Sequence, residues 1–484
     1  MTLTHKNLTD AVLYPLWLDN PAAPAPMPHL VGRTDADLLI VGGGYSGLWA
    51  AIIAKQRAPG RDVVVIEAGK VAHGASGRAG GIVSTSVMHG LVNAQRVFPQ
   101  DLDLLEKLGI ENLDAWRQTI KDFGIDADLE WGGEMTVAIG AQDIPDLRRE
   151  YDLHKGHGHD IVWLDRDAVT AQVASPLFQA GIWSKYRTGT LQPAKLAWGL
   201  RDAAIKLGVR VYEHTPMEAV DDLGHKMRIT THDGLIDAPK VLFATNAWGA
   251  GHKDIKKYVV AMRDRVIATA LLSAEQLDRL GWTNRQGIYD TRTQLNYMRL
   301  TRDNRIVYGG RIGYAFNDNI DPAGDRRIDV YDRLAGYFAQ TFPQLGDVKF
   351  SHAWSGPIDL TTRLAVHFQP YYNGKAVYVG GYSGFGVTAS RFGARMALEM
   401  LDQTGVPELQ LALAATLPRR IPREPMRWIG AGITMRALDE VDTKGGWRRA
   451  WLKMVHAMGS RFRWLHVPAR GSHRAIPPAP AAGQ

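Results

Sequence analysis

The first residues that could do chemistry are glycines spaced to bring a backbone close to phosphate. Gly42, Gly44 and Gly47 satisfy the pattern G-x-G-x-x-G, and Glu67 follows 20 residues later at the end of a predicted strand. The first glycine permits a tight turn, the second admits a pyrophosphate, and the third lets helix and strand pack closely. Glu67 can accept both ribose hydroxyls. We predict a dinucleotide site here, with three neighbours also in contact: Tyr45, Ser46 and Ala68.

Two further loops are built of small residues. Residues 74–81 come soon after Glu67, and residues 380–386 follow a predicted strand and precede a helix. Small residues would let the chain pass flat against a planar ring, and a helix dipole would stabilise negative charge on it when reduced. On spacing alone, the first loop could also be a surface loop and the second a simple strand–helix turn. The predicted contacts are Ala75, Ser76, Gly77, Arg78, Gly80, Gly81, Gly381, Gly384, Phe385, Gly386 and Val387.

Segment 289–311 supplies candidates for the substrate side. An arginine fork is a natural partner of a carboxylate, although arginines mostly lie on solvated faces. Tyr297 and Arg299 have the same parity and would point to one face of a strand, and His352 and Trp354 could line the same cavity. The segment also contains Tyr289, Asp290, Arg292, Arg302, Arg305 and Arg311.

The elements that would position these residues alternate between strand and helix. Strands are predicted at residues 37–41 and 62–67, with a helix at 47–57 between them, which is a βαβ start. Further helices are predicted at 101–123, 193–207 and 388–401, and buried strands at 209–212, 238–245 and 377–380. Residues 257–350 alternate strand-like and turn-like segments, which predicts a mostly antiparallel sheet. The fold class is therefore α/β, with an α+β part that would carry the substrate.

Composition limits the classes of protein. The chain has 484 residues, enough for about two domains, and no cysteine, which excludes disulfides, iron–sulfur clusters and cysteine zinc sites. The net charge of +7 is concentrated in residues 419–484, which carry +9, so the remainder sums to −2. Nucleic-acid binding by the whole fold is therefore not expected.

Membrane and metal signals are weak. No apolar run reaches the ~20 residues that span a bilayer, and the polar start Met1–Asp10 lacks a signal-peptide core, so a cytoplasmic protein is expected.

His154, His157 and His159 could form a metal site, but without a supporting carboxylate pattern a polar loop is favoured and no metal is predicted.

With these motifs in place, the chain resembles the D-amino-acid oxidase (DAO) family of FAD-dependent oxidoreductases over roughly residues 35–405. It is most similar to the glycine oxidase, monomeric sarcosine oxidase and gamma-glutamylputrescine oxidase group. The resemblance rests on residues 42–47 with Glu67, on the loops at 74–81 and 380–386, on Leu191-Gln192-Pro193, and on residues 244–248. It implies that FAD is the cofactor and adds Thr245 and Asn246 to its predicted contacts.

The resemblance implies an interleaved, DAO/glutathione-reductase-like architecture. A Rossmann-type FAD-binding domain would combine residues 35–95, 190–255 and 350–405. A mostly antiparallel substrate domain would combine 96–189 and 256–349. Residues 1–34 would be an extended lead-in, and 406–484 a basic C-terminal extension. Packing of its basic segment 447–456 on the FAD domain is favoured over peripheral contact with a membrane or a protein.

The implied reaction oxidises the C–N bond of a small primary or secondary amine or amino acid that bears a carboxylate. Hydride passes to flavin N5, and the imine that forms is hydrolysed. The alternatives are an FAD-dependent 2-hydroxy-acid dehydrogenase and an NAD(P)H-linked flavin reductase or monooxygenase, although no second nucleotide unit is found mid-chain.

Two positions depart from the sarcosine oxidase pattern. His352 stands where those members attach the flavin through cysteine, and we expect non-covalent FAD. Tyr308 stands where they place a lysine, so oxygen is expected to be a slow electron acceptor compared with another acceptor such as a quinone. Together with Tyr297, Arg299 and Trp354, these two residues complete the predicted catalytic set.

Overall fold

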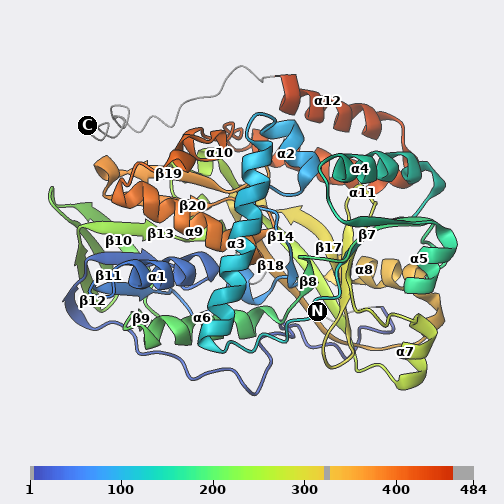
Figure 1. The fold of residues 1–484 in the computed structure, drawn as a ribbon, viewed down its shortest axis with the longest axis horizontal. Helices are drawn as coiled ribbons and strands as arrows, with labels where there is room; N and C mark the ends of the chain where they lie inside the picture. Colours follow the sequence, from blue (N-terminus) through green and yellow to red (C-terminus); the bar gives the residue numbers. More distant parts are fainter. Residues whose placement is uncertain (1–4, 321–327, 462–484) are drawn as a thin grey trace.

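Two large β-sheets lie side by side in the computed structural model, which describes residues 5–320 and 328–461 (Figure 1). A six-stranded sheet with helices on one face occupies one half of the molecule, and an eight-stranded sheet occupies the other. This pairing of a helix-covered, largely parallel sheet with a largely antiparallel one confirms the predicted fold class.

The six-stranded sheet is parallel apart from one edge strand. Its strand order places the two strands of the predicted βαβ start, β2 and β3, beside each other. The edge strand β19 runs antiparallel to β20. In sheet order the strands are β19 (His367–Tyr371), β20 (Ala376–Gly380), β13 (Lys240–Phe243), β2 (Leu38–Val41), β3 (Val63–Ile66) and β9 (Arg210–Tyr212).

Strand parity decides what covers each face of this sheet. Leu38 and Ile40 pack in the core that includes the helices, whereas Leu39 and Val41 pack in a second core under a small sheet. The helices are α1 (Tyr45–Arg57), α6 (Pro193–Lys206) and α9 (Gly386–Asp402), with α3 (Leu102–Phe123) against α9. The small sheet has the order β1 (Gly32–Asp35), β12 (Gly234–Ala238), β11 (Met227–Thr231) and β10 (Met217–Asp222).

The strands of the eight-stranded sheet pair antiparallel, except that β15 pairs parallel with β5. Helix α8 (Ile328–Thr341) packs against β14 and β17. In sheet order the strands are β18 (Phe350–Thr361), β14 (Val259–Thr269), β17 (Ile306–Tyr314), β16 (Asn296–Leu300), β15 (Gly287–Asp290), β5 (Glu134–Ala138), β7 (Ala180–Ser184) and β6 (Ile161–Leu164).

The remaining described elements connect or flank these layers. Short strands β4 (Ile82–Val83) and β8 (Gly189–Thr190) pair with each other. The other helices are α2 (Leu91–Val97), α4 (Ile144–Gly156), α5 (Arg166–Gln172), α7 (Ala274–Leu280), α10 (Ala412–Ala415), α11 (Met426–Lys444) and α12 (Trp447–Arg461). No helix in the described ranges is long and apolar enough to cross a membrane.

Three sequence expectations need correction. Residues 350–361 were grouped with the FAD domain, but they form β18, which pairs along its length with β14 of the eight-stranded sheet. The lead-in is extended only in part, because residues 6–10 and 16–18 form turns before β1 pairs with β12. The single strand expected at 238–245 is divided between the end of β12 and β13. The rest of the domain division stays a prediction.

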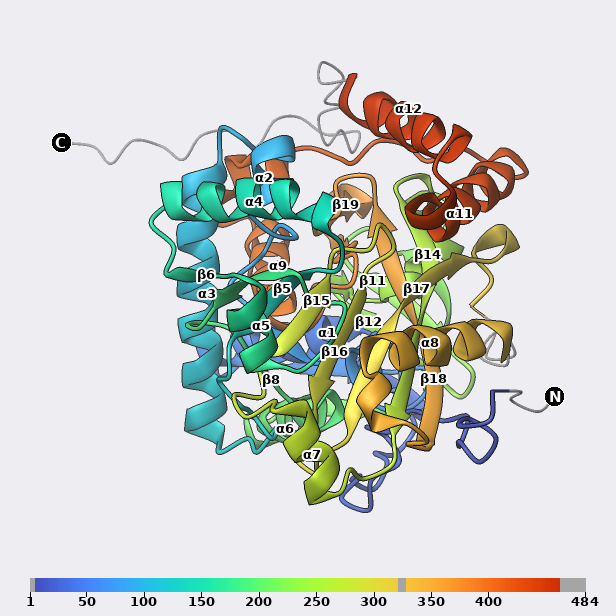
Figure 2. The ribbon, with the colours of Figure 1, turned by 90° about the vertical axis from the view of Figure 1, so that its right-hand side faces the viewer.

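The basic segment 447–456 lies elsewhere than expected, although residues 407–415 before it do pack against α9 and β19. Helix α12, which contains this segment, packs on α11, and α11 packs against β17 of the eight-stranded sheet (Figure 2). Arg427 and Ala437 of α11 are buried, and the Arg427 guanidinium donates a hydrogen bond to the Lys256 carbonyl at 2.9 Å. The Pro-rich final dozen residues lie outside the described ranges.

Candidate active site

A cavity of about 410 Å³ lies where the glycine loops meet the eight-stranded sheet. Its size and its mixture of apolar walls with a few polar groups are typical of a small-molecule site. Most of the predicted cofactor contacts line it. These are Gly44, Tyr45, Ser46, Ala75, Ser76, Arg78, Gly80, Gly81, Asn246, Gly384, Phe385, Gly386 and Val387.

The first glycines are required by close packing of backbones. Gly42 has φ +116°, and a Cβ there would lie 2.5 Å from the Ala244 carbonyl oxygen. A Cβ on Gly47 would lie 1.9 Å from the Gly42 oxygen. Helix α1 starts directly after Gly44, which has no side chain to cap that end. Its N-terminus therefore faces the cavity as an anion site with backbone donors.

Glu67 lies at the carboxyl end of β3, as expected for a ribose ligand. Its Oε2 accepts a hydrogen bond from the Gly43 N–H at 2.8 Å, and its Oε1 accepts one from the Gly69 N–H at 2.9 Å. Burial raises the pKa of Glu67, and the two backbone donors lower it. The carboxylate is thus held in one orientation, with lone pairs left for hydroxyl groups. Ala68 beside it is exposed.

The loop at residues 74–81 is fixed against helix α1 and the sheet. The Ser76 Oγ accepts a hydrogen bond from the Tyr45 N–H at 2.9 Å. Arg78 donates to the carbonyls of His73 and Ser355 at 2.9 and 2.8 Å. Gly77 does not line the cavity, and a Cβ there would lie 2.2 Å from the Ala72 oxygen. The loop therefore presents Arg78 to the cavity while its backbone stays in place.

The loop at residues 380–386 is held by a buried carboxylate. Asp359 accepts hydrogen bonds from the N–H groups of Gly381 and of Tyr382, the latter at 3.1 Å. Burial raises the pKa of Asp359 to about 6. Gly381 itself has φ +81° and does not line the cavity. This loop leads directly into helix α9, so the dipole of that helix points at the cavity.

Asn246 carries an unmet hydrogen-bonding requirement beside the same cavity. Its Oδ1 is buried without a partner among the described residues, and its backbone has φ +45°. Thr245 precedes it at the start of a short 3-10 helix and does not line the cavity. A buried acceptor without a donor is costly unless a ligand completes it. Together with the glycine cradle and Glu67, this fits FAD.

Tyr297 and Asp264 form the polar part of the opposite wall. The Tyr297 hydroxyl donates to Asp264 Oδ2 at 2.6 Å, and both residues line the cavity. Burial raises the pKa of Asp264 to about 6, although the Tyr297 hydrogen bond lowers it. Gly80 and Gly309 leave room for the tyrosine ring, because a Cβ on either would lie within 2.6 Å of it. Two glycines therefore fix where this ring stands.

Aromatic rings surround this pair. Tyr289 lies 6.4 Å from the Tyr297 ring and stacks with Phe385 at 6.3 Å and 14°. His89 lies 4.0 Å from Phe385, and burial lowers its pKa to about 4, so the imidazole is neutral near pH 7. A wall of this kind favours a compact substrate with an apolar portion.

Arg299 does not reach the cavity, contrary to its predicted contact with substrate. It is 1% exposed, and its guanidinium donates to the carbonyls of Leu191 and of Leu300, the latter at 3.0 Å. Its parity matches that of Tyr297, but it lies two residues further along β16. There the carbonyls of Gly81 and Leu191, which flank the paired strands β4 and β8, accept its hydrogen bonds. Burial lowers its pKa to about 10.

Tyr308 also lies away from the cavity. It is fully buried on the other face of the sheet, edge-on to Phe338 of α8 at 5.7 Å, with its hydroxyl 3.4 Å from Thr341 Oγ1. The sheet register explains this, because Gly309 and not Tyr308 lies opposite Tyr297. The argument from Tyr308 about oxygen therefore does not hold.

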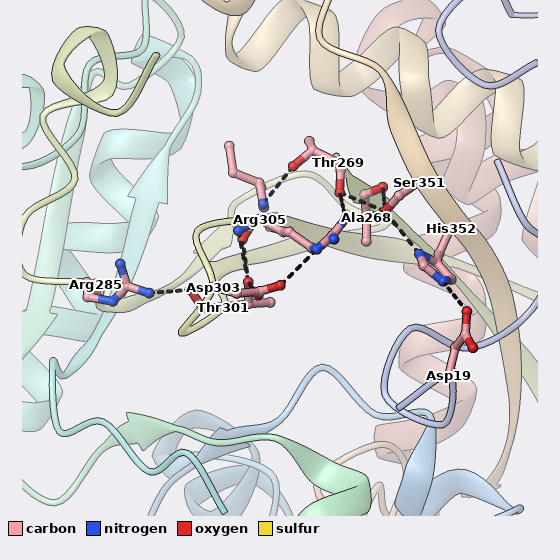
Figure 3. A network of polar contacts seen from close by, with 10 residues as sticks. Asp19, Ala268, Thr269, Arg285, Thr301, Asp303, Arg305, Ser351 and His352 are labelled. Carbon is pink, nitrogen blue, oxygen red and sulfur yellow. Dashed lines mark hydrogen bonds and ion pairs between the residues drawn. The ribbon is translucent and has the colours of Figure 1, made fainter. Parts of the chain in front are cut away.

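His352 and Trp354 support the site without lining it. His352 contacts Asp19 Oδ2 and Ser351 Oγ, each at 3.0 Å (Figure 3), and the same network holds Arg305. Trp354 donates from Nε1 to the Arg78 carbonyl at 3.0 Å. Both side chains therefore act on neighbouring loops, and Trp354 positions the loop that carries Arg78.

The histidine group of helix α4 is a polar cluster. His154 and His159 contact each other at 2.7 Å, and His159 contacts Glu106 at 3.1 Å. Across the described ranges no group of histidine and acidic residues is arranged to hold a metal ion.

Sequence reasoning did not single out several cavity residues, among them Asp264, His89 and Arg311. Asp264 lies between Arg263 and Arg265 in strand β14, and nothing in the sequence distinguished it as a cavity residue. No motif or residue spacing in the sequence marked His89 as a site residue. Arg311 was one of several arginines in segment 289–311, and nothing in the sequence ranked it above the others.

The chain belongs to the FAD dependent oxidoreductase (DAO) family, whose model matches residues 37–400. It is 32% identical to the gamma-glutamylputrescine oxidoreductase of Escherichia coli (strain K12) over 384 residues, which cover 78% of this chain and 86% of that one. It is 29% identical to the glycine oxidase of Geobacillus kaustophilus over 225 residues, 44% of this chain and 55% of the relative. The protein is thus an FAD-dependent oxidoreductase.

Solved structures share the fold. The crystal structure of glycine oxidase from Geobacillus kaustophilus superposes with a TM-score of 0.65 at 18% identity, covering 78% of this chain and 97% of that one. L-proline dehydrogenase from P. horikoshii gives a TM-score of 0.63 at 16% identity, covering 79% and 96%.

Proposed function

We propose that the chain oxidises the C–N bond of a small amine or amino acid. The observation that carries this proposal is the Asp264 carboxylate, which lines the cavity and is held by the Tyr297 hydroxyl at 2.6 Å. A buried carboxylate that lines the cavity beside aromatic rings is a partner for an amine nitrogen. The names of the relatives, gamma-glutamylputrescine oxidoreductase and glycine oxidase, support the same substrate class.

The residues of this chain would bind and orient the amine. Ionised Asp264 accepts a hydrogen bond from the substrate nitrogen and takes the proton that an ammonium must lose before its lone pair is available. When bound, FAD supplies the hydride acceptor. The hydride leaves the carbon next to nitrogen, the nitrogen lone pair forms the C=N bond, and water then hydrolyses the imine to a carbonyl compound and an amine or ammonia.

The other enzyme classes receive less support. A 2-hydroxy-acid dehydrogenase could use the same fold, but a buried carboxylate suits a cationic nitrogen better than a neutral hydroxyl. A reductase or monooxygenase would need a nicotinamide site. The glycines at 309, 310 and 313 lie within strand β17 and not at a strand–helix turn, so they offer no second nucleotide unit.

The electron acceptor is oxygen or another acceptor such as a quinone. The earlier preference for a quinone rested on Tyr308, which lies on the other face of the sheet. Arg78 and Arg311 both line the cavity, so positive charge is available to stabilise superoxide. We therefore favour oxygen. A cytoplasmic location, and contact of the basic extension with a membrane or protein, stay predictions.

Anaerobic titration tests this function. Purified holoenzyme is mixed with matched pairs of amines and hydroxy acids of equal carbon skeleton, and loss of the oxidised flavin absorbance is recorded. We expect amines to reduce the flavin, and Asp264→Asn to slow that reduction at least tenfold, an effect typical of a group that acts in proton transfer. Reduction by hydroxy acids alone would favour the dehydrogenase instead.

A further inference from the structure

The two long helices of the C-terminal extension, α11 and α12, carry exposed apolar side chains. In the ribbon views α12 lies at the edge of the molecule and packs on α11, which in turn packs on β17 (Figures 1 and 2). The exposed apolar residues are Met426, Trp428 and Ile429 of α11 and Trp447 and Met454 of α12. Exposed apolar patches rimmed by polar residues mark interaction sites.

One side of α12 is fixed against α11. The Trp451 Nε1 donates a hydrogen bond to Thr434 Oγ1 at 3.1 Å, and the Arg448 Nε donates one to Glu440 Oε2 at 2.6 Å. Arg448 and Trp451 are three residues apart, so they lie on the same side of α12. These contacts determine which side of α12 points away from α11.

The opposite side of α12 combines an apolar strip with a cationic one. Trp447, Ala450 and Met454 are spaced by three and four residues, so they lie in one row, and all three are exposed. Arg449 and Lys453 are four residues apart, are also exposed, and form a row beside the first. We call these five residues the outer face of α12.

The charge of the chain is concentrated in the same region. Residues 419–484 carry +9, whereas the remainder of the chain sums to −2. A cationic region of this kind attracts an anionic surface, and each lysine or arginine close to anionic lipid strengthens the binding several-fold. Tryptophan is enriched at the level of the lipid headgroups. The outer face therefore combines the two features that hold a helix in the plane of a membrane surface.

We propose that the outer face of α12 docks on a membrane surface that contains anionic phospholipid. Trp447 and Met454 enter the boundary between headgroups and acyl chains, and the cationic row pairs with the lipid phosphates. A second copy of this chain is a poorer occupant. Contact of two copies through the same face would bring Arg449 and Lys453 of both copies together, and like charges across an interface repel.

The docking helix is joined to the cavity through α11. Leu438 of α11 lines the cavity, and Asp442 accepts hydrogen bonds from the Thr293 N–H at 3.1 Å and hydroxyl at 2.5 Å. Thr293 also lines the cavity. Both helices lie beyond residues 37–400, which match the family, so the docking surface belongs to the extension of this chain. Binding to lipid is independent of the reaction that the cavity performs.

Sedimentation of vesicles with full-length holoenzyme tests the docking. One set of vesicles is phosphatidylcholine alone, and the other contains about 30% phosphatidylglycerol, whose headgroup supplies the negative charge. We expect binding to the anionic vesicles to be at least tenfold tighter, and the difference to disappear at about 0.5 M salt, because salt screens exposed charges. Equal binding to both sets of vesicles, or binding to neither, would overturn the proposal.

Two double variants separate the cationic row from the apolar row. Arg449→Glu/Lys453→Glu should weaken binding to the anionic vesicles at least tenfold, because repulsion replaces attraction at two positions. Trp447→Ser/Met454→Ser should also weaken it at least tenfold but keep the preference for anionic vesicles, because it removes apolar contact area. Flavin content and melting temperature should stay as in wild type, since these side chains are exposed. Undiminished binding in either variant would contradict the assignment of the outer face.

Arg279→Glu/Arg302→Glu is the matched control for net charge. Both side chains are exposed, and Arg279 belongs to α7, which lies at the opposite end of the molecule from α12 (Figure 2). The control changes the net charge as much as Arg449→Glu/Lys453→Glu does. We expect its vesicle binding to stay within about twofold of wild type. A loss equal to that of the α12 variant would show that overall charge, and not this face, binds the lipid.

The oligomeric state tests the competing occupant. Light scattering during size-exclusion chromatography gives the mass of wild type and of Trp447→Ser/Met454→Ser. We expect the same mass for both proteins. A wild-type dimer that this variant dissociates, together with no binding to anionic vesicles, would assign the outer face to a second copy and overturn the proposal.

Discussion

The Tyr297 hydroxyl donates a hydrogen bond to Asp264 Oδ2 at 2.6 Å, and this pair joins strands β16 and β14 across the intervening β17 at the cavity wall. The two residues are 33 positions apart in the chain. Their pairing places a carboxylate of raised pKa beside a phenol that stabilises its ionised form. The pH dependence of the reaction should therefore depend on both residues.

We predict that flavin reduction rises with pH through about 6. Burial raises the pKa of Asp264 to about 6, so the carboxylate is protonated below that pH and ionised above it. Tyr297→Phe removes a donor to the ionised form, so the pKa of Asp264 should rise further and move the inflection upward by about one unit. Anaerobic stopped-flow rates between about pH 5 and 8 check this.

The control for this prediction is Asp264→Asn, which should lose the inflection altogether. Its amide keeps the shape of the carboxyl group but does not titrate. An inflection that persists in Asp264→Asn would assign the titration to another group. An inflection that stays in place in Tyr297→Phe would show that the hydroxyl does not stabilise the ionised carboxylate.

Glu67→Ala should lose FAD affinity at least tenfold. The variant removes the carboxylate that we expect to bind the ribose and that holds the Gly43 and Gly69 N–H groups. Flavin fluorescence during titration of the apoprotein measures the affinity. Glu111→Ala, at an exposed position of helix α3, is the control and should bind FAD as wild type does. Equal affinity in Glu67→Ala would remove this assignment.

Gly47→Ala should destabilise the protein by about 1–3 kcal/mol, the usual range for overpacking. The new Cβ would lie 1.9 Å from the Gly42 oxygen, so helix α1 and the phosphate turn would have to separate. Thermal unfolding and flavin content measure the effect. Gly336→Ala in helix α8 meets no atom within 4 Å and should be neutral or slightly stabilising. Similar melting temperatures for the two variants would contradict the packing argument.

Acid precipitation should release all of the flavin into the supernatant. The chain has no cysteine, and His352 contacts Asp19 and Ser351 and does not line the cavity. Neither a cysteine nor His352 is therefore available to form a covalent bond with the flavin. Yellow colour retained in the protein pellet would show that the attachment is covalent, and digestion followed by mass spectrometry would then identify the residue.

Oxygen should reoxidise the reduced flavin in air-saturated buffer as fast as substrate reduces it, with stoichiometric hydrogen peroxide. This reverses the expectation drawn from Tyr308, because Arg78 and Arg311 line the cavity and a cation lowers the barrier to superoxide formation. Stopped-flow reoxidation after anaerobic reduction measures the rate. Slow reoxidation by oxygen with fast reoxidation by a soluble quinone would instead identify a dehydrogenase.

The sequence by itself determined the cofactor half of the site. A strand, a glycine turn and a helix are local in the chain, and their backbone packing requires glycine at Gly42 and Gly47 whatever lies beyond. The same local reasoning placed β3 with Glu67 at its end, and the loops at 74–81 and 380–386. These predictions were specific because the backbone must come close to a phosphate or a planar ring, and few residue types are small enough to allow this close approach.

Only the tertiary structure decided the substrate half. Alternation along a strand put Tyr297 and Arg299 on one face, but the carbonyls of Gly81 and Leu191 that bind Arg299 come from distant parts of the chain. Asp264 became a site residue through pairing between strands, and Arg311 through an irregularity that a two-residue period cannot encode. The C-terminal extension joined the cavity because α11 packs on β17, a contact between elements over 100 residues apart that the sequence pattern does not specify.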